Sequence, residues 1–194
     1  MTSDKYFKVK LLAGLVVLMV LTRYSLFRPL GLPSATLAAF FIAGIYLRQW
    51  IFPALLIGAA GFTDYMSVQA GSSSWCITPA YGFLIPAYLA LWFGGRRFES
   101  LETEGLKQVF SIAVVLGVTT TVAFIISNSS FYALSGKEGY DDVSLLEYMQ
   151  IQFTRYPGYI LKPFLYTGTL VAIFYKGLLP QYLKSKELSA SIPK

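Results

Sequence analysis

The sequence predicts an all-α membrane protein built as a bundle of six transmembrane helices, and three observations support this. Of its 194 residues, 55% are hydrophobic and only 13% are charged. The mean hydropathy of +0.56 is well above that of an ordinary soluble domain. Six apolar stretches reach, with their flanks, the length of about 20 residues that crosses a bilayer. We therefore expect one membrane domain over residues 1–194, with helices at about 9–26, 34–47, 50–63, 75–93, 109–127 and 159–179.

The first stretch is expected to be a membrane helix and not a cleaved secretory signal. Three lysines precede its apolar run from Leu11 to Leu21, as in a signal peptide. However, no pair of small residues that would mark a cleavage site follows the run, and the chain continues with Thr22, Arg23 and Tyr24 instead.

The second and third stretches are short and are separated only by Arg48 and Gln49, which predicts a tight helical hairpin. Small residues at a four-residue spacing let helices approach closely. We favour internal packing over contact with a partner protein for these residues. They are Ala35, Ala39 and Ala43 in the second helix and, with a related spacing, Ala54, Gly58 and Phe62 in the third.

The distribution of basic residues predicts that both termini lie in the cytoplasm. In that orientation eleven of the sixteen lysines and arginines fall on the inner side, and the connection 65–74 on the outer side has none. This bias is the one that orients inner-membrane proteins. The net charge of +6 is therefore attributed to topology, and no nucleic-acid partner is expected.

The segment 128–158 is predicted to be a lid on the outer face, because a connection of this length in a small protein is usually functional or disordered. Its aromatic residues include Phe131 and Tyr132, and its charged residues include Arg155. Asp141 or Asp142 is the expected cap of a short helix through Gln152. The alternative is a passive connector with an interfacial belt of aromatic side chains.

The residue types present exclude several chemistries. The chain has no histidine, which removes the Ser-His-Asp and Cys-His types of catalysis and every histidine metal site. It also has no phosphate-binding GxxxxGK[ST] loop, so it does not hydrolyse ATP itself. Asp64, at the outer end of the third helix, is either an interfacial carboxylate in water or a group that fixes a ligand or a loop.

Cys76 is the sole cysteine, so it cannot form an intramolecular disulfide and is either inert packing or a reactive thiol. Its predicted position, at the outer start of the fourth helix, favours a thiolate. Pro79 suits a first helical turn, and Trp75 and Tyr81 provide aromatic walls. A single soft thiolate suits an axial position on a metal that a macrocycle already holds.

These features resemble the BtuM family of small bacterial cobalamin transporters, which are similar in fold to the substrate-binding S-components of energy-coupling-factor transporters. The resemblance rests on the size, the six spans, the run Thr63-Asp64-Tyr65 and the segment Trp75-Cys76-x-x-Pro79-x-Tyr81-x-x-x-x-Pro86-Ala87-Tyr88. The first helix departs from the AxxxA pattern used to dock on an energising module, since Val17 follows Ala13, and this puts such a partner in doubt.

The resemblance implies that the protein takes up cobalamin from the periplasmic side of the bacterial inner membrane, without an independent metal ion. Cys76 would be the axial ligand of the cobalt and could displace a group such as cyanide. Further binding residues would lie around it. They are Asp64, Tyr65, Trp75, Tyr81, Tyr88, Phe131, Tyr132 and Arg155.

Three alternatives remain open. The chain could be an S-component for another vitamin, with Cys76 as packing. It could be a membrane enzyme that uses Cys76 as a nucleophile, although Asp64 and Tyr81 are poor bases for that purpose. It could also be a structural subunit of a larger complex.

Overall fold

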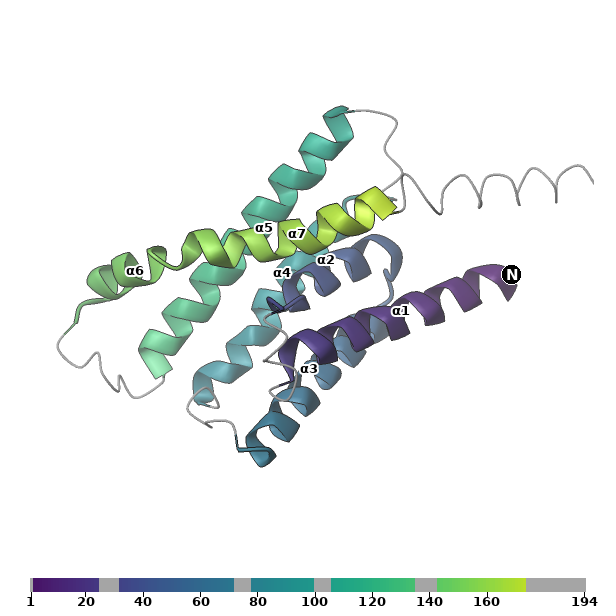
Figure 1. Ribbon diagram of the computed structural model, residues 1–194. Coiled ribbons are helices and arrows are strands. Elements are labelled where there is room, and N and C mark those ends of the chain that lie inside the picture. Colours follow the sequence, from purple (N-terminus) through teal and green to yellow (C-terminus); the bar gives the residue numbers. More distant parts are fainter. Residues whose placement is uncertain (1, 25–31, 72–77, 100–105, 135–142, 174–194) are drawn as a thin grey trace, which may run out of the picture.

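The fold is all-α, as the sequence predicts. The computed structural model describes residues 2–24, 32–71, 78–99, 106–134 and 143–173, and this part of the chain contains helices and turns but no strand. The helices, labelled in Figure 1, are α1 (Thr2–Arg23), α2 (Thr36–Tyr46), α3 (Ile51–Gln69), the 3-10 helix η3 (Pro79–Phe83), α4 (Leu84–Gly95), α5 (Leu106–Leu134), α6 (Leu145–Phe153) and α7 (Tyr156–Ile173).

Helix α2 forms the centre of the molecule. It contacts α1, α3, α4 and α7, and Figure 1 shows it between α1 and α7. Nine of its eleven residues are buried, which agrees with a helix that is apolar all round. Ala35, Ala39 and Ala43 are all 0% exposed, so the prediction that they pack inside the protein is confirmed.

Glycines allow α2 and α4 to cross with their backbones in contact. A Cβ atom on Gly44 would lie 2.9 Å from the carbonyl carbon of Trp92 and still closer to its oxygen. A Cβ atom on Gly95 would clash in the same way with the carbonyl of Phe41. Only glycine fits at these two positions, because any side chain would push the helices apart.

The small residues of α3 do not pack inside the protein, so that part of the prediction is wrong. Ala54 and Gly58 are exposed, and Phe62 is 65% exposed. The opposite face of the helix faces the core, because the buried residues of α3 recur at helical spacing. They are Pro53, Leu56, Ala60, Thr63 and Ser67.

The fourth helix begins later than predicted, at Pro79 and not at residue 75. Thr78, the last residue before it, is extended with φ −110° and ψ 172°. A residue before proline is driven out of the helical region by the proline ring, and proline itself suits a first helical position. Cys76 and Trp75 lie outside the described residues.

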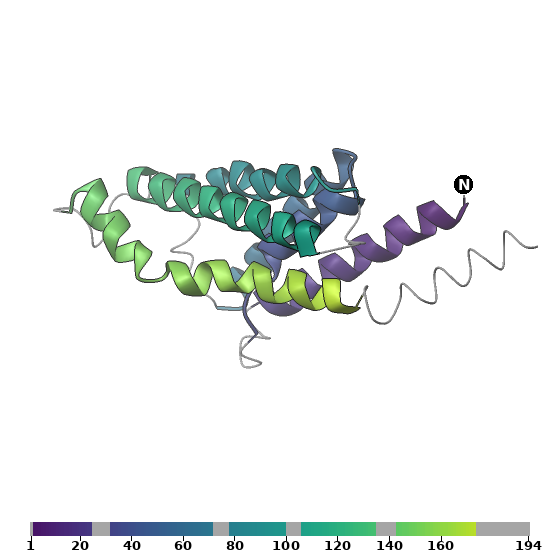
Figure 2. The same ribbon diagram turned by 90° about the horizontal axis from the view of Figure 1, so that it is seen from above.

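The second half of the chain forms the remaining side of the bundle. Helix α5 continues to Leu134 and so takes in the first residues of the predicted lid. Helices α6 and α7 follow one another, and α5 packs beside α7 (Figure 2). By length and composition, two described helical segments could cross a membrane, Ile51–Gln69 and Lys107–Leu134.

Candidate functional site

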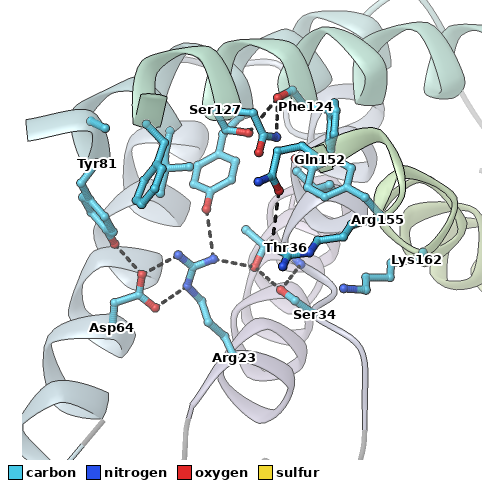
Figure 3. A pocket seen from close by; sticks show the side chains of 18 of the residues that line it. Arg23, Ser34, Thr36, Asp64, Tyr81, Phe124, Ser127, Gln152, Arg155 and Lys162 are labelled. Atoms are coloured by element: carbon cyan, nitrogen blue, oxygen red, sulfur yellow. Dashed lines mark hydrogen bonds and ion pairs between the residues drawn. The ribbon is translucent and has the colours of Figure 1, made fainter. Parts of the chain in front are cut away.

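A cavity of about 640 Å³ lies at one end of the bundle. Because the helices alternate in direction, this end gathers the last residues of α1, α3 and α5 and the first residues of α2, α4 and α7. Figure 3 shows most of the side chains that line it. They are Arg23, Ser34, Thr36, Leu37, Asp64, Ala80, Tyr81, Leu84, Tyr88, Phe124, Ser127, Asn128, Phe131, Tyr148, Gln152, Arg155, Gly158, Tyr159 and Lys162.

The floor of the cavity is an ion pair between Arg23 and Asp64. Arg23 donates from Nε to Oδ1 at 2.6 Å and from Nη2 to Oδ2 at 2.5 Å. The two side chains are 16% and 23% exposed, so the pair is largely removed from solvent. Two parallel hydrogen bonds of this kind fix both partners in position as well as adding energy. The ion pair therefore ties the end of α1 to α3.

The same arginine holds two further walls of the cavity. Its Nη1 atom donates to the Tyr88 hydroxyl at 3.0 Å and to Thr36 Oγ1 at 3.3 Å. The Tyr81 hydroxyl donates to Asp64 Oδ2 at 2.6 Å. Through these bonds one polar cluster positions residues from α1, α2, α3, η3 and α4 (Figure 3).

Aromatic rings form the apolar part of the cavity. Tyr88, only 6% exposed, stacks on Phe40 with ring centroids 4.7 Å apart. On the other side Phe124, 2% exposed, packs edge-on against Tyr159 at 5.2 Å and Tyr156 at 5.1 Å. Packed rings of this kind have few conformations, so the cavity keeps its shape without a ligand.

A short helix, α6, covers one side of the cavity with Tyr148 and Gln152. Its cap is Ser144 and not Asp141 or Asp142, which lie outside the described residues. Ser144 and Glu147 form a reciprocal capping box, which satisfies two backbone N–H groups at the helix start. Hydrogen bonds from the side chain and backbone of Ser144 lower the pKa of Glu147 below that of an ordinary glutamate.

Of the nine residues expected to bind the ligand, five line this one cavity, two lie elsewhere, and two fall outside the described residues. Tyr65 is 57% exposed and absent from the lining. Tyr132 is also absent from the lining, and its hydroxyl donates to the Val143 carbonyl at 2.8 Å while its ring packs against Tyr148. Cys76 and Trp75 fall outside the described residues. The five in the lining are Asp64, Tyr81, Tyr88, Phe131 and Arg155.

Sequence reasoning missed two basic residues of the cavity, Arg23 and Lys162. Both belong to the five lysines and arginines that the predicted orientation leaves on the outer side. One signal was present in the sequence: Arg23 closes an apolar helix, where an unpaired charge would be costly to bury. Among the described residues, no three His, Cys, Asp or Glu side chains come together as metal ligands.

No protein-family model matches the chain, and no curated protein matches it either.

Proposed function

We propose that this protein is a multi-pass protein of the bacterial inner membrane that binds cobalamin in the cavity and takes it up from the periplasm. The observation that carries the proposal is the cavity itself. A closed polar floor, aromatic walls and an open rim are the usual construction of a small-molecule site, and about 640 Å³ falls within the usual size range of about 300–1,000 Å³.

The open rim accommodates a ligand larger than the cavity. Arg155, Gly158 and Lys162 are exposed, whereas Thr36, Tyr88 and Phe124 are buried. A bulky ligand can therefore seat one face against the aromatic walls and extend past α7. Flat aromatic side chains suit a macrocycle, because they offer large apolar contact area at low conformational cost.

Cobalamin is favoured over other ligands by the position of Cys76 in the chain. Cys76 is two residues before Thr78, and two residues span at most about 8 Å. Ala80 and Tyr81, a few residues further on, line the cavity. In the proposed complex the Cys76 thiolate is the axial ligand of cobalt. When cyanocobalamin binds, the sulfur donates an electron pair to cobalt and cyanide leaves with the pair that bound it.

The surface of α5 supports the membrane location. Val114, Val118, Val122 and Ile125 are between 40% and 58% exposed and recur along one side of the helix. An exposed apolar stripe of this length suits contact with lipid chains. With the N-terminus in the cytoplasm, the end of α1 that carries Arg23 lies on the periplasmic side, and the cavity opens there.

Helix α2 is too short to cross a membrane by itself. Its eleven residues make a helix about 16 Å long, about half of the hydrocarbon thickness of about 30 Å. Its burial by four neighbouring helices supplies the reason it is tolerated, because a short helix at membrane depth is accommodated where it is buried in protein.

The test is the absorption spectrum of purified protein with cyanocobalamin. We expect the wild type to bind the corrinoid and to shift its spectrum as the cyanide is replaced, and Cys76→Ala to leave the spectrum unchanged. The same pair of proteins is then compared for growth of a cobalamin-dependent host that lacks its own uptake system. A wild type that neither binds cyanocobalamin nor restores growth would refute the proposal.

A further inference from the structure

The lining of the cavity carries an excess of positive charge. Among the described residues that line it, the ionisable acidic and basic side chains are those of Arg23, Asp64, Arg155 and Lys162, which together carry a net charge of plus two. A cavity with unbalanced charge is most stable when a ligand of opposite charge enters it, because each bare charge loses hydration as the site closes. The ligand should therefore carry negative charge.

Arg23 is not the group that meets this charge. Its Nε and Nη2 atoms are both bonded to the Asp64 carboxylate, and its Nη1 atom is bonded to Thr36 and Tyr88. A ligand anion would have to break the ion pair to reach it. The excess charge is thus located on Arg155 and Lys162.

Arg155 and Lys162 share one side of the cavity. Arg155 lies in the turn just before α7, where its carbonyl accepts a hydrogen bond from the Tyr159 N–H at 3.1 Å. Gly158, Tyr159 and Lys162 lie on one face of α7 and also line the cavity. Figure 3 shows both charged side chains reaching into the cavity toward Ser34. Gly158 has no atom within 4 Å of where a Cβ would be, which leaves open space between the two cations.

Neither cation is neutralised by the described part of the chain. The hydrogen bond of Arg155 is a long one, 3.4 Å, to the uncharged Gln152 amide oxygen. The described carboxylate in the cavity is that of Asp64, which is taken by Arg23 and Tyr81. The start of α2 borders the same space through Ser34 and Thr36, and the positive end of its dipole adds to the attraction for an anion.

We infer that Arg155 and Lys162 form an anion site that holds the phosphodiester of the ligand. This inference rests on the proposed function and deepens it, because cobalamin carries one phosphodiester, in the loop that joins its nucleotide to the corrin ring. An arginine and a lysine are suited to this group: the first donates two parallel hydrogen bonds, and the second adds a compact charge. The corrin ring then lies against the aromatic walls, with its nucleotide loop toward α7.

The test compares two corrinoids, cyanocobalamin and cobinamide, which lacks the nucleotide loop and its phosphodiester. Titrations of the purified full-length protein give the affinity of each ligand for the wild type, Arg155→Gln and Lys162→Gln. We expect each substitution to weaken cyanocobalamin binding by about tenfold and to leave cobinamide binding within about threefold of wild type. Arg97→Gln and Lys10→Gln, at exposed positions outside the cavity, are the matched controls and should not discriminate between the ligands.

The charge-conserving variants Arg155→Lys and Lys162→Arg keep a cation at each position and should retain most of the preference for cyanocobalamin. Equal losses for both corrinoids, or no loss for either, would overturn the anion site while leaving the proposed function standing. A wild-type protein that binds neither corrinoid would overturn both.

Discussion

Removal of one partner of the Arg23–Asp64 ion pair is expected to destabilise the whole end of the bundle. Two unit charges about 4 Å apart in an effective dielectric of about 20 attract each other by about 4 kcal/mol. Breaking a buried pair costs about 3–5 kcal/mol, because the remaining charge is left without a partner. Since these side chains are 16% and 23% exposed, we expect Asp64→Leu and Arg23→Met each to cost about 3 kcal/mol, at the lower end of that range.

The measurement is the midpoint of thermal unfolding in detergent, followed by size-exclusion chromatography. For a chain of 194 residues, 1 kcal/mol corresponds to a shift of about 2–4 °C, so each single variant should unfold about 6–12 °C below wild type. The double variant removes both charges and leaves no bare one. It should therefore be more stable than the sum of the single effects predicts, by about 1–3 kcal/mol.

The exposed Arg97 provides the control for loss of an arginine. Arg97→Met should change stability by no more than about 0.5 kcal/mol, as surface substitutions usually do. If the double variant lost as much stability as the two single variants added together, Arg23 and Asp64 would not be coupled. The description of the cavity floor as one interlocked cluster would then be wrong.

Two further predictions concern the frame of the cavity and its cover. Gly44→Ala should lower the midpoint of thermal unfolding by about 2–12 °C, since overpacking costs about 1–3 kcal/mol. The control is Gly58→Ala, whose new methyl group meets open space and should not lower the midpoint. Equal effects of the two substitutions would contradict the close crossing of α2 and α4. Because the pKa of Glu147 is lowered in the fold, its cap stabilises α6 above about pH 4.5 and is lost as the pH falls through the lowered value. In the wild type, amide hydrogen exchange in residues 145–153 should accelerate, relative to its intrinsic rate, as the pH falls through that value. Glu147→Gln should show no such acceleration in this pH range. An acceleration of the same size in Glu147→Gln would contradict the role of the Glu147 carboxylate in the cap.

The helical class could be predicted from the sequence because it depends on composition and on runs of apolar residues, which are local properties. The start of the predicted fourth helix, which is the start of η3, could not be placed as well. Pro79 was correctly read as a residue of a first helical turn, but its effect on the preceding Thr78, which it holds extended, was not taken into account. The small residues of α3 were misread for a related reason. A four-residue spacing shows that two residues share a helix face, but it does not show whether that face meets protein or the surroundings.

The site was predictable only where one residue was unusual by itself. Asp64 was noticed because a carboxylate at the end of an apolar helix is rare. Its partner Arg23 is 41 positions away, and Lys162 comes from the last helix, so neither contact could be found without the three-dimensional arrangement. Basic residues near membrane ends are common, and a count of them by side of the membrane cannot separate those that orient the chain from those that line a cavity.

The cavity has two sides with different physical roles. On the floor, Arg23 uses its donors on partners from three other helices, and an ion pair of this kind adds little net stability compared with apolar packing. Its consequence is instead positional, since Tyr81 and Tyr88 are held in one arrangement before any ligand arrives, which reduces the entropy lost on binding. On the α7 side, Arg155 and Lys162 are exposed, and the bond from the Arg155 side chain is a long one of 3.4 Å to the uncharged Gln152. Recognition of the apolar body of a ligand is thus built into the rigid floor and walls, whereas recognition of its charge is left to side chains that can adjust to it.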